Sequence, residues 1–202
     1  MKTVLLIALV FGLISTVVAQ TSNTGGSGAG ECKLTVAQAP AIRGIRLGMS
    51  AEQALAQIPG SEADSDLLAR LSRDLFGSRN AYIVPGNYVT SKEKFAGIKS
   101  INLTFLDGRL VSLYIHYDGP EWRSDKQFVA RLAELLNLPG VGSWKPVQGG
   151  LAIVCDGVEI SGQLLGLKDS VIGIKDTKVD AAAVVREREE VPKEKARRAF
   201  KP

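Results

Sequence analysis

His116 is the only histidine of this chain and the residue best suited to acid–base chemistry. A serine or cysteine hydrolase of the usual kind needs a histidine beside its nucleophile. The sequence has no Gly-x-Ser-x-Gly turn, and neither Cys32 nor Cys155 stands in the sequence context of a nucleophile. We therefore expect no catalytic residue, no metal site and no cofactor. The alternative is a hydrolase with an unusual site near His116 or near Glu121 and Asp125.

Two pairs of carboxylates have the residue types that glycoside hydrolysis requires. Asp64 and Asp66 stand at the expected start of a helix, where acids interact favourably with the helix dipole. Glu121 and Asp125 bracket Trp122 just before another expected helix. We interpret both pairs as helix-start acids.

Two tryptophans, Trp122 and Trp144, flank the third expected helix. They leave two interpretations open. The pair could clamp a sugar or an apolar ligand, or it could close the ends of the hydrophobic core, which is the more common role of such residues.

The two cysteines, Cys32 and Cys155, are expected to form a disulfide if the chain is exported to an oxidising compartment. The closed loop is long, and the chain-entropy account gives such a bridge about 4–5 kcal/mol. Two buried reduced thiols are the alternative. Two cysteines and one histidine are too few for a four-coordinate structural zinc site.

Three helices are expected from capping signals and apolar periodicity. The first follows the Ser50 cap and ends at Pro59-Gly60, and the second runs from about Asp64 to Phe76, with Gly77 just past its end. The third follows the Ser124 cap and ends near 138–140. The apolar positions expected to face the core are Ala51, Ala54, Leu55, Ile58, Leu67, Leu68, Leu71, Leu75, Phe128, Leu132, Leu135 and Leu136.

Alternating segments predict a hairpin over 98–106 and 109–117, with Asp107-Gly108 at its turn. A two-residue turn would put the apolar sets of the two strands on opposite faces. A three-residue loop of Leu106, Asp107 and Gly108 puts them on one face, so we expect that loop and a bulge. The opposite, polar face then carries a candidate binding surface, formed by Asn102, Thr104, Ser112, Tyr114 and His116, with Ser100 beside them. The alternative interpretation is that these residues are the ordinary solvent-exposed face of an antiparallel sheet.

A second hairpin is expected over 151–164, with a two-residue turn at Asp156-Gly157 that points Cys155 into the core. One more strand is expected over 170–175. The fold class is therefore α+β, an antiparallel sheet of about five strands packed against two or three helices. Each half has a Ser-x-x-Gln helix start followed by an Asp-Gly hairpin, so an internal duplication into two helix-hairpin halves is a further possibility.

The first 19 residues are expected to be a cleavable signal peptide, with Lys2 before an apolar run and Val17 and Ala19 at the cleavage site. Residues 20–31 read as a flexible Gly/Ser linker, 32–179 as a single α+β domain, and 180–202 as a charged tail. In the tail, Asp180 would cap a helix over 181–190 that Pro192 breaks. We expect an exported protein, periplasmic or secreted, with no transmembrane anchor after cleavage.

The net charge of +4 comes mainly from the two ends of the chain. Residues 20–185 hold 17 Lys and Arg against 17 Asp and Glu, whereas residues 186–202 hold 7 against 4. A nucleic-acid-binding domain would place a basic cluster on its folded part. We therefore expect no nucleic-acid partner.

The segment from Ile45-Arg46-Leu47-Gly48-Met49-Ser50 to Ile58-Pro59-Gly60 resembles the opening of BamE/SmpA-type and β-lactamase-inhibitor-like envelope domains. The likeness covers residues 45–60 only, and this chain departs from the pattern in its third helix and in lacking a lipidation cysteine. The resemblance implies an exported α+β binding or scaffolding domain. We accordingly expect a non-enzymatic domain that binds a protein or an envelope component.

Overall fold

The computed structural model describes residues 32–73 and 77–199. The expected signal peptide and linker lie outside these residues, as does Leu75. The helices are α1 (Ala51–Leu55), α2 (Ser65–Leu71), α3 (Asp125–Leu135) and α4 (Thr177–Ala199). The strands are β1 (Ser78–Ile83), β2 (Ile98–Leu106), β3 (Arg109–Asp118), β4 (Lys145–Val147), β5 (Gly150–Val154), β6 (Val158–Leu164) and β7 (Asp169–Asp176).

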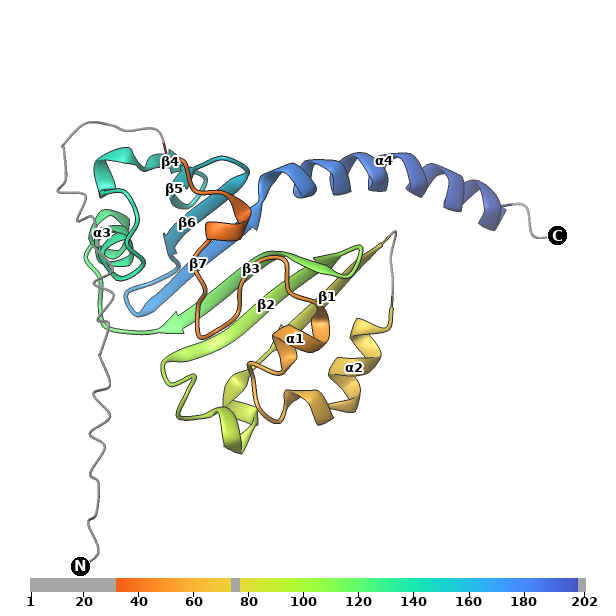
Figure 1. Ribbon diagram of the computed structural model, residues 1–202, viewed down its shortest axis with the longest axis horizontal. Helices are drawn as coiled ribbons and strands as arrows, with labels where there is room; N and C mark the ends of the chain where they lie inside the picture. Colours follow the sequence, from red (N-terminus) through yellow and green to blue (C-terminus); the bar gives the residue numbers. More distant parts are fainter. Residues whose placement is uncertain (1–31, 74–76, 200–202) are drawn as a thin grey trace, which may run out of the picture.

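All seven described strands form one antiparallel sheet in the order β1-β2-β3-β7-β6-β5-β4. The expected α+β class is confirmed, with more strands than the five expected. The sheet consists of two meanders, β1-β2-β3 and β4-β5-β6-β7, that pair through β3 and β7, the last strand of each. Helices α1 and α2 lie over the first meander and α3 lies beside the second (Figure 1).

One hydrophobic core runs under both meanders. Gly162 on β6 shows how closely α3 approaches the sheet, because a Cβ atom there would lie 2.6 Å from Val129 Cγ2. The residues of α1, α2 and α3 that belong to this core include Ala54, Leu55, Leu67, Leu71, Phe128, Val129, Leu132 and Ala133.

Two of the leucines expected to face the core do not do so. Leu68 on α2 is 44% exposed and Leu135 on α3 is 66% exposed. The helices are also shorter than expected: α2 ends at Leu71, so Gly77 does not terminate it and instead precedes β1. A short helix buries a narrow stripe, which here leaves one leucine of each helix outside.

The turn between β2 and β3 differs from the three-residue loop that we expected. Leu106 pairs with Arg109, so the turn has two residues, Asp107 (φ 48°) and Gly108 (φ 78°), both left-handed as a type I′ turn requires. The bulge lies inside β3 instead, where Val111 is the extra residue between Leu110 and Ser112. The apolar sets share one face as the burial argument demands, but the shift in register is made in the strand.

This bulge is tied to the segment that precedes α1. The Leu110 N–H donates to Met49 O at 2.7 Å, and the Gly48 N–H donates to Leu110 O at 2.8 Å. Residues 48–49 thus occupy the position beside β3 that β7 no longer fills, since β7 pairs with β3 only as far as Ser112. The Ser50 cap and its reciprocal bond with Gln53 follow directly, as expected.

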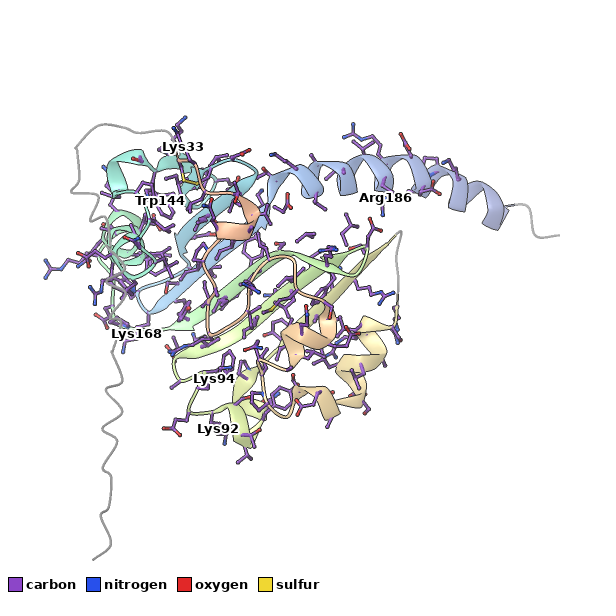
Figure 2. The ribbon with its side chains drawn as sticks, in the orientation of Figure 1. Lys33, Lys92, Lys94, Trp144, Lys168 and Arg186 are labelled. Atoms are coloured by element: carbon purple, nitrogen blue, oxygen red, sulfur yellow. A yellow bond between two sulfur atoms is a disulfide. The ribbon has the colours of Figure 1, made fainter. Side chains whose placement is uncertain are left out.

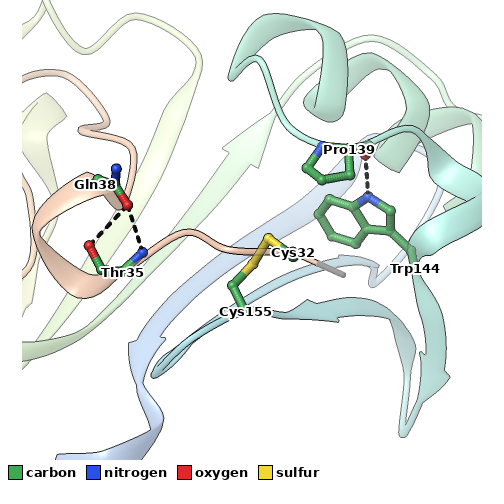
Figure 3. The surroundings of a disulfide bond; sticks show 6 residues. All are labelled: Cys32, Thr35, Gln38, Pro139, Trp144 and Cys155. Carbon is green, nitrogen blue, oxygen red and sulfur yellow. Dashed lines mark hydrogen bonds between the residues drawn. A yellow bond between two sulfur atoms is a disulfide. The ribbon is translucent and has the colours of Figure 1, made fainter. Parts of the chain in front are cut away.

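The second hairpin and the disulfide are as expected. The Cys155 N–H donates to Val158 O at 2.7 Å across a two-residue turn at Asp156-Gly157. Cys155 is buried and is bonded to Cys32, 123 residues earlier in the chain (Figure 3). The bridge fastens the segment before η1 (Val36–Gln38) to the second meander.

The C-terminal helix is longer than the expected 181–190 segment. Helix α4 begins at Thr177, where Asp176 Oδ1 accepts from the Lys178 and Val179 N–H groups, and it continues through Pro192. Proline removes one backbone donor from a helix, which interrupts one hydrogen bond without ending this helix. The helix extends past the sheet (Figure 1), and no described helix is both long enough and apolar enough to cross a membrane.

Candidate functional site

The candidate binding surface lies on the sheet face opposite the core. The register of β2 and β3 places its members directly across from one another, in the pairs Ser100–His116, Asn102–Tyr114 and Thr104–Ser112. The structure therefore brings together all the residues that the sequence grouped. Ser100 is buried, whereas Tyr114 keeps 37% of its surface exposed.

Strand β1 extends this surface with a residue that sequence reasoning missed. Tyr82 pairs with Asn102, is 54% exposed, and stands on the same face. Next to it, Asn80 Oδ1 accepts from Thr104 Oγ1 at 2.8 Å. The segment S-R-N-A-Y-I lacks a clear strand signal, because only its last residues alternate between apolar and polar positions. The sequence alone therefore does not predict this contribution.

The ring of Tyr114 is placed by a glycine on the neighbouring strand. Gly173 pairs with Tyr114, and a Cβ atom on Gly173 would lie 2.5 Å from Tyr114 Cε1 and 2.5 Å from Ser161 Oγ. The absent side chain leaves the space that the ring occupies across β7. One row of paired positions thus crosses five strands and consists of Tyr82, Asn102, Tyr114, Gly173 and Ser161.

Charges on this face are compensated. The adjacent row pairs Ser112 with Lys175 and Lys175 with Glu159. The Lys175 Nζ atom lies 3.3 Å from Glu159 Oε1, and both side chains are about three-quarters buried. The surface as a whole is aromatic and polar with balanced charge.

His116 has Ser100 and Val171 as its cross-strand neighbours. The carboxylates named with it in the hydrolase alternative have structural partners elsewhere. Asp125 Oδ1 accepts from the Leu164 N–H at 2.8 Å, and Glu121 lies 3.8 Å from Lys168 Nζ. These bonds join α3 and the loop before it to the β6–β7 turn.

Asp64 has the capping role that we interpreted for it. Its Oδ1 accepts from the Leu67 N–H at 2.9 Å and its Oδ2 accepts from the Tyr88 hydroxyl at 2.7 Å. These two bonds lower the pKa of Asp64. Burial, followed by the bond to Asp64, raises the pKa of Tyr88 to about 12. The pair is a neutral hydroxyl bound to a stabilised carboxylate, which fixes α2 to the segment between β1 and β2.

The two tryptophans have different environments. Trp144 is buried, and its Nε1–H donates to Pro139 O at 3.0 Å (Figure 3). Trp122 is half-buried, tilts at 55° against Phe128 with ring centroids 5.6 Å apart, and lines a cavity of about 360 Å³. Trp144 thus closes the core, while only Trp122 is placed to touch a ligand. Trp144 and Lys168 lie at the α3 end of the molecule, far from Arg186 on α4 (Figure 2).

Within 32–73 and 77–199, no group of three or more His, Cys, Asp or Glu side chains is arranged to hold a metal ion. Comparison with known proteins adds no assignment. No model of a protein family matches the chain, and no curated protein or solved structure is significantly similar to it.

Proposed function

We propose that this chain is a non-enzymatic binding protein that works outside the cytoplasm and holds a protein partner on the open face of its sheet. The single observation that carries the proposal is the row of Tyr82, Asn102 and Tyr114 on the face opposite the core. Tyrosine is enriched in protein interfaces because it offers a large rigid surface with one polar end.

Charge supports a protein partner of a particular kind. Lys175 is paired with Glu159, so the face has little attraction for a strongly charged polymer. Its hydroxyl and amide groups can bond to peptide groups and uncharged polar side chains, while its two tyrosine rings cover apolar ones. The partner that fits best is therefore a protein with an uncharged polar and apolar surface.

Export is supported by two features. The first 19 residues have the pattern of a cleavable signal, and the Cys32–Cys155 disulfide is of the kind that persists in oxidising compartments. The proposed likeness to envelope domains over 45–60 agrees with this location. No arrangement among the described residues favours the hydrolase alternative.

Site-directed photo-crosslinking tests the proposed face. A benzophenone side chain in place of Tyr82, which is 54% exposed, lies on the face. One in place of Val89, which is 83% exposed and therefore at least as accessible, lies in η4 (Val89–Ser91), away from the sheet strands. We expect one envelope protein to be crosslinked from position 82 and not from position 89. The purified partner should then bind the parent protein directly in calorimetry.

The double variant Tyr114→Ala, His116→Ala should abolish both the crosslink from position 82 and the direct binding. Circular dichroism would show that the variant stays folded, because both side chains lie on the face opposite the core. Equal crosslinking from positions 82 and 89, or unchanged binding by the double variant, would disprove this site.

A further inference from the structure

The cavity beside Trp122 lies at the other end of the molecule from the β1 edge and is built mainly from apolar groups. Residues 41–43, the end of β3 and the loop after it, α3 with the residue that follows it, and the start of β7 form it. Phe128, Leu132 and Ile172 line it and are buried, so they form its deep part. Its volume of about 360 Å³ is at the lower end of the range, about 300–1,000 Å³, that small-molecule sites occupy.

Leu135 is an apolar residue of the cavity lining that the protein leaves largely exposed. It belongs to the stripe of α3 that the sequence predicts to face the core, and it lines the cavity, yet it is 66% exposed. Its neighbours on the same stripe, Phe128 and Leu132, are covered by protein. A ligand in the cavity would complete the burial of the stripe, which is favourable in proportion to the apolar area removed from water.

The charged residues that line the cavity are both cationic. Arg43 and Arg131 are exposed, and no carboxylate is among the lining residues. Arg131 Nη1 bonds to Glu134 Oε2 at 2.7 Å, which uses one of the five donors of the guanidinium. An apolar interior with guanidinium groups at the solvent side matches a ligand that has an apolar chain and an anionic end.

Tyr117 adds a neutral hydrogen-bond donor to the lining. Burial raises the pKa of its phenol, although Arg43 acts in the opposite direction. The phenol therefore stays protonated at neutral pH and does not add negative charge near the arginines.

We propose that this cavity binds a single-chain carboxylate, a medium-chain fatty acid, with its chain between Trp122, Phe128 and Leu132 and its carboxylate at Arg43 and Arg131. One chain is favoured because the volume is small for a ligand site. Arginine pairs with a carboxylate through two parallel hydrogen bonds. This site is separate from the open face of the sheet, so either proposal can fail without the other.

Titration of the mature protein with hexanoate, octanoate and decanoate tests the chain-binding part. Each added pair of methylenes should lower Kd by roughly tenfold, since burial of one methylene contributes about 0.8 kcal/mol. Calorimetry would measure Kd, and the emission of Trp122 should change on binding, a change that Trp122→Phe removes. Equal affinity along the series would overturn the proposal.

Arginine variants test the charge-binding part. Arg43 has φ 53°, so Arg43→Asn is the suitable change, because asparagine tolerates this left-handed conformation. It should weaken decanoate binding about tenfold and leave decanol binding unchanged. Arg70→Asn on α2, outside the cavity, is the matched control and should change neither.

Leu135→Glu places a negative charge at an exposed position of the lining. The variant should therefore stay folded, and it should weaken decanoate binding at least as much as Arg43→Asn does. Loss of decanoate binding in Tyr114→Ala, His116→Ala would place the ligand on the sheet face and overturn the cavity proposal. So would binding to phosphatidylglycerol vesicles in the absence of any decanoate binding.

Discussion

Asp64 contributes to stability through two bonds that require its charged form. It accepts from the Leu67 N–H at the start of α2 and from the Tyr88 hydroxyl, which comes from the segment after β1. Both bonds favour the carboxylate, and they lower its pKa below the ordinary value of 3.8. This stabilisation is therefore present above the unfolded-state pKa and is lost as the pH falls through the lower pKa of the folded state.

We predict that Asp64→Ala lowers the free energy of unfolding by about 1 kcal/mol at pH 7, the usual loss when an N-cap side chain is removed. The difference between variant and parent should shrink in urea titrations as the pH falls from 5 toward 2. Asp66→Ala, in the first turn of the same helix, is the control and should have a smaller effect at pH 7. A loss that is independent of pH would show that the charge of Asp64 does not matter.

At the scale of the elements, the sequence predicts the helices and hairpins that carry strong local signals, such as a capping side chain or an Asp-Gly turn. The Ser50, Asp64 and Ser124 side chains each accept from a backbone N–H at a helix start. Both hairpins turn at the expected Asp-Gly pairs, although the first turn has two residues where a three-residue loop was expected. β1 and β4 (Lys145–Val147) were missed because one is mostly polar and the other is three residues long with a proline inside. Both are edge strands, where one neighbour is enough and the local signal is weak.

The position of the β3 bulge was not predictable from alternation alone. A bulge in the turn and a bulge at Val111 both place the apolar sets on one face. The two positions of the bulge differ in whether Leu110 can bond to residues 48–49, and these residues are remote from Leu110 in the sequence. The cavity depends on remote contacts in the same way, because residues 41–43 meet α3 only in the folded chain. The polar face, by contrast, depends only on the alternation within β2 and β3 and on their shared hairpin, so the sequence predicts its residues.

The two-residue turn makes a prediction about Gly108. It has φ 78° and open space around the position of a Cβ atom, so Gly108→Ala tests the backbone conformation without a clash. We expect a loss of about 1–2 kcal/mol in the free energy of unfolding, the cost of a left-handed alanine. Gly86→Ala, where a Cβ atom also meets open space and φ is not left-handed, should change stability little. Equal effects of the two changes in chemical denaturation would contradict the type I′ turn.

At the scale of the whole molecule, the two meanders share a single core and are joined in two ways. β3 and β7 pair over seven residue positions, and the Cys32–Cys155 bridge fastens the start of the described chain to the second meander. Helix α4 spans both Asp-Gly turns, because Lys178 Nζ bonds to Asp156 and Arg186 bonds to Asp107 with two donors. These connections make the halves interdependent, whether or not they arose by duplication.

We therefore predict that the oxidised protein unfolds in one cooperative transition. The two tryptophans of the chain, Trp122 and Trp144, both lie in the second half, so their fluorescence reports that half, whereas far-UV circular dichroism reports the whole sheet. The two signals should give the same midpoint in guanidinium, as a single core requires. Reduction should keep the midpoints coincident and lower the free energy of unfolding by about 2–5 kcal/mol, because the bridge closes a loop of more than a hundred residues. A fluorescence midpoint that differs from the circular dichroism midpoint in the oxidised protein would show that the meanders fold separately.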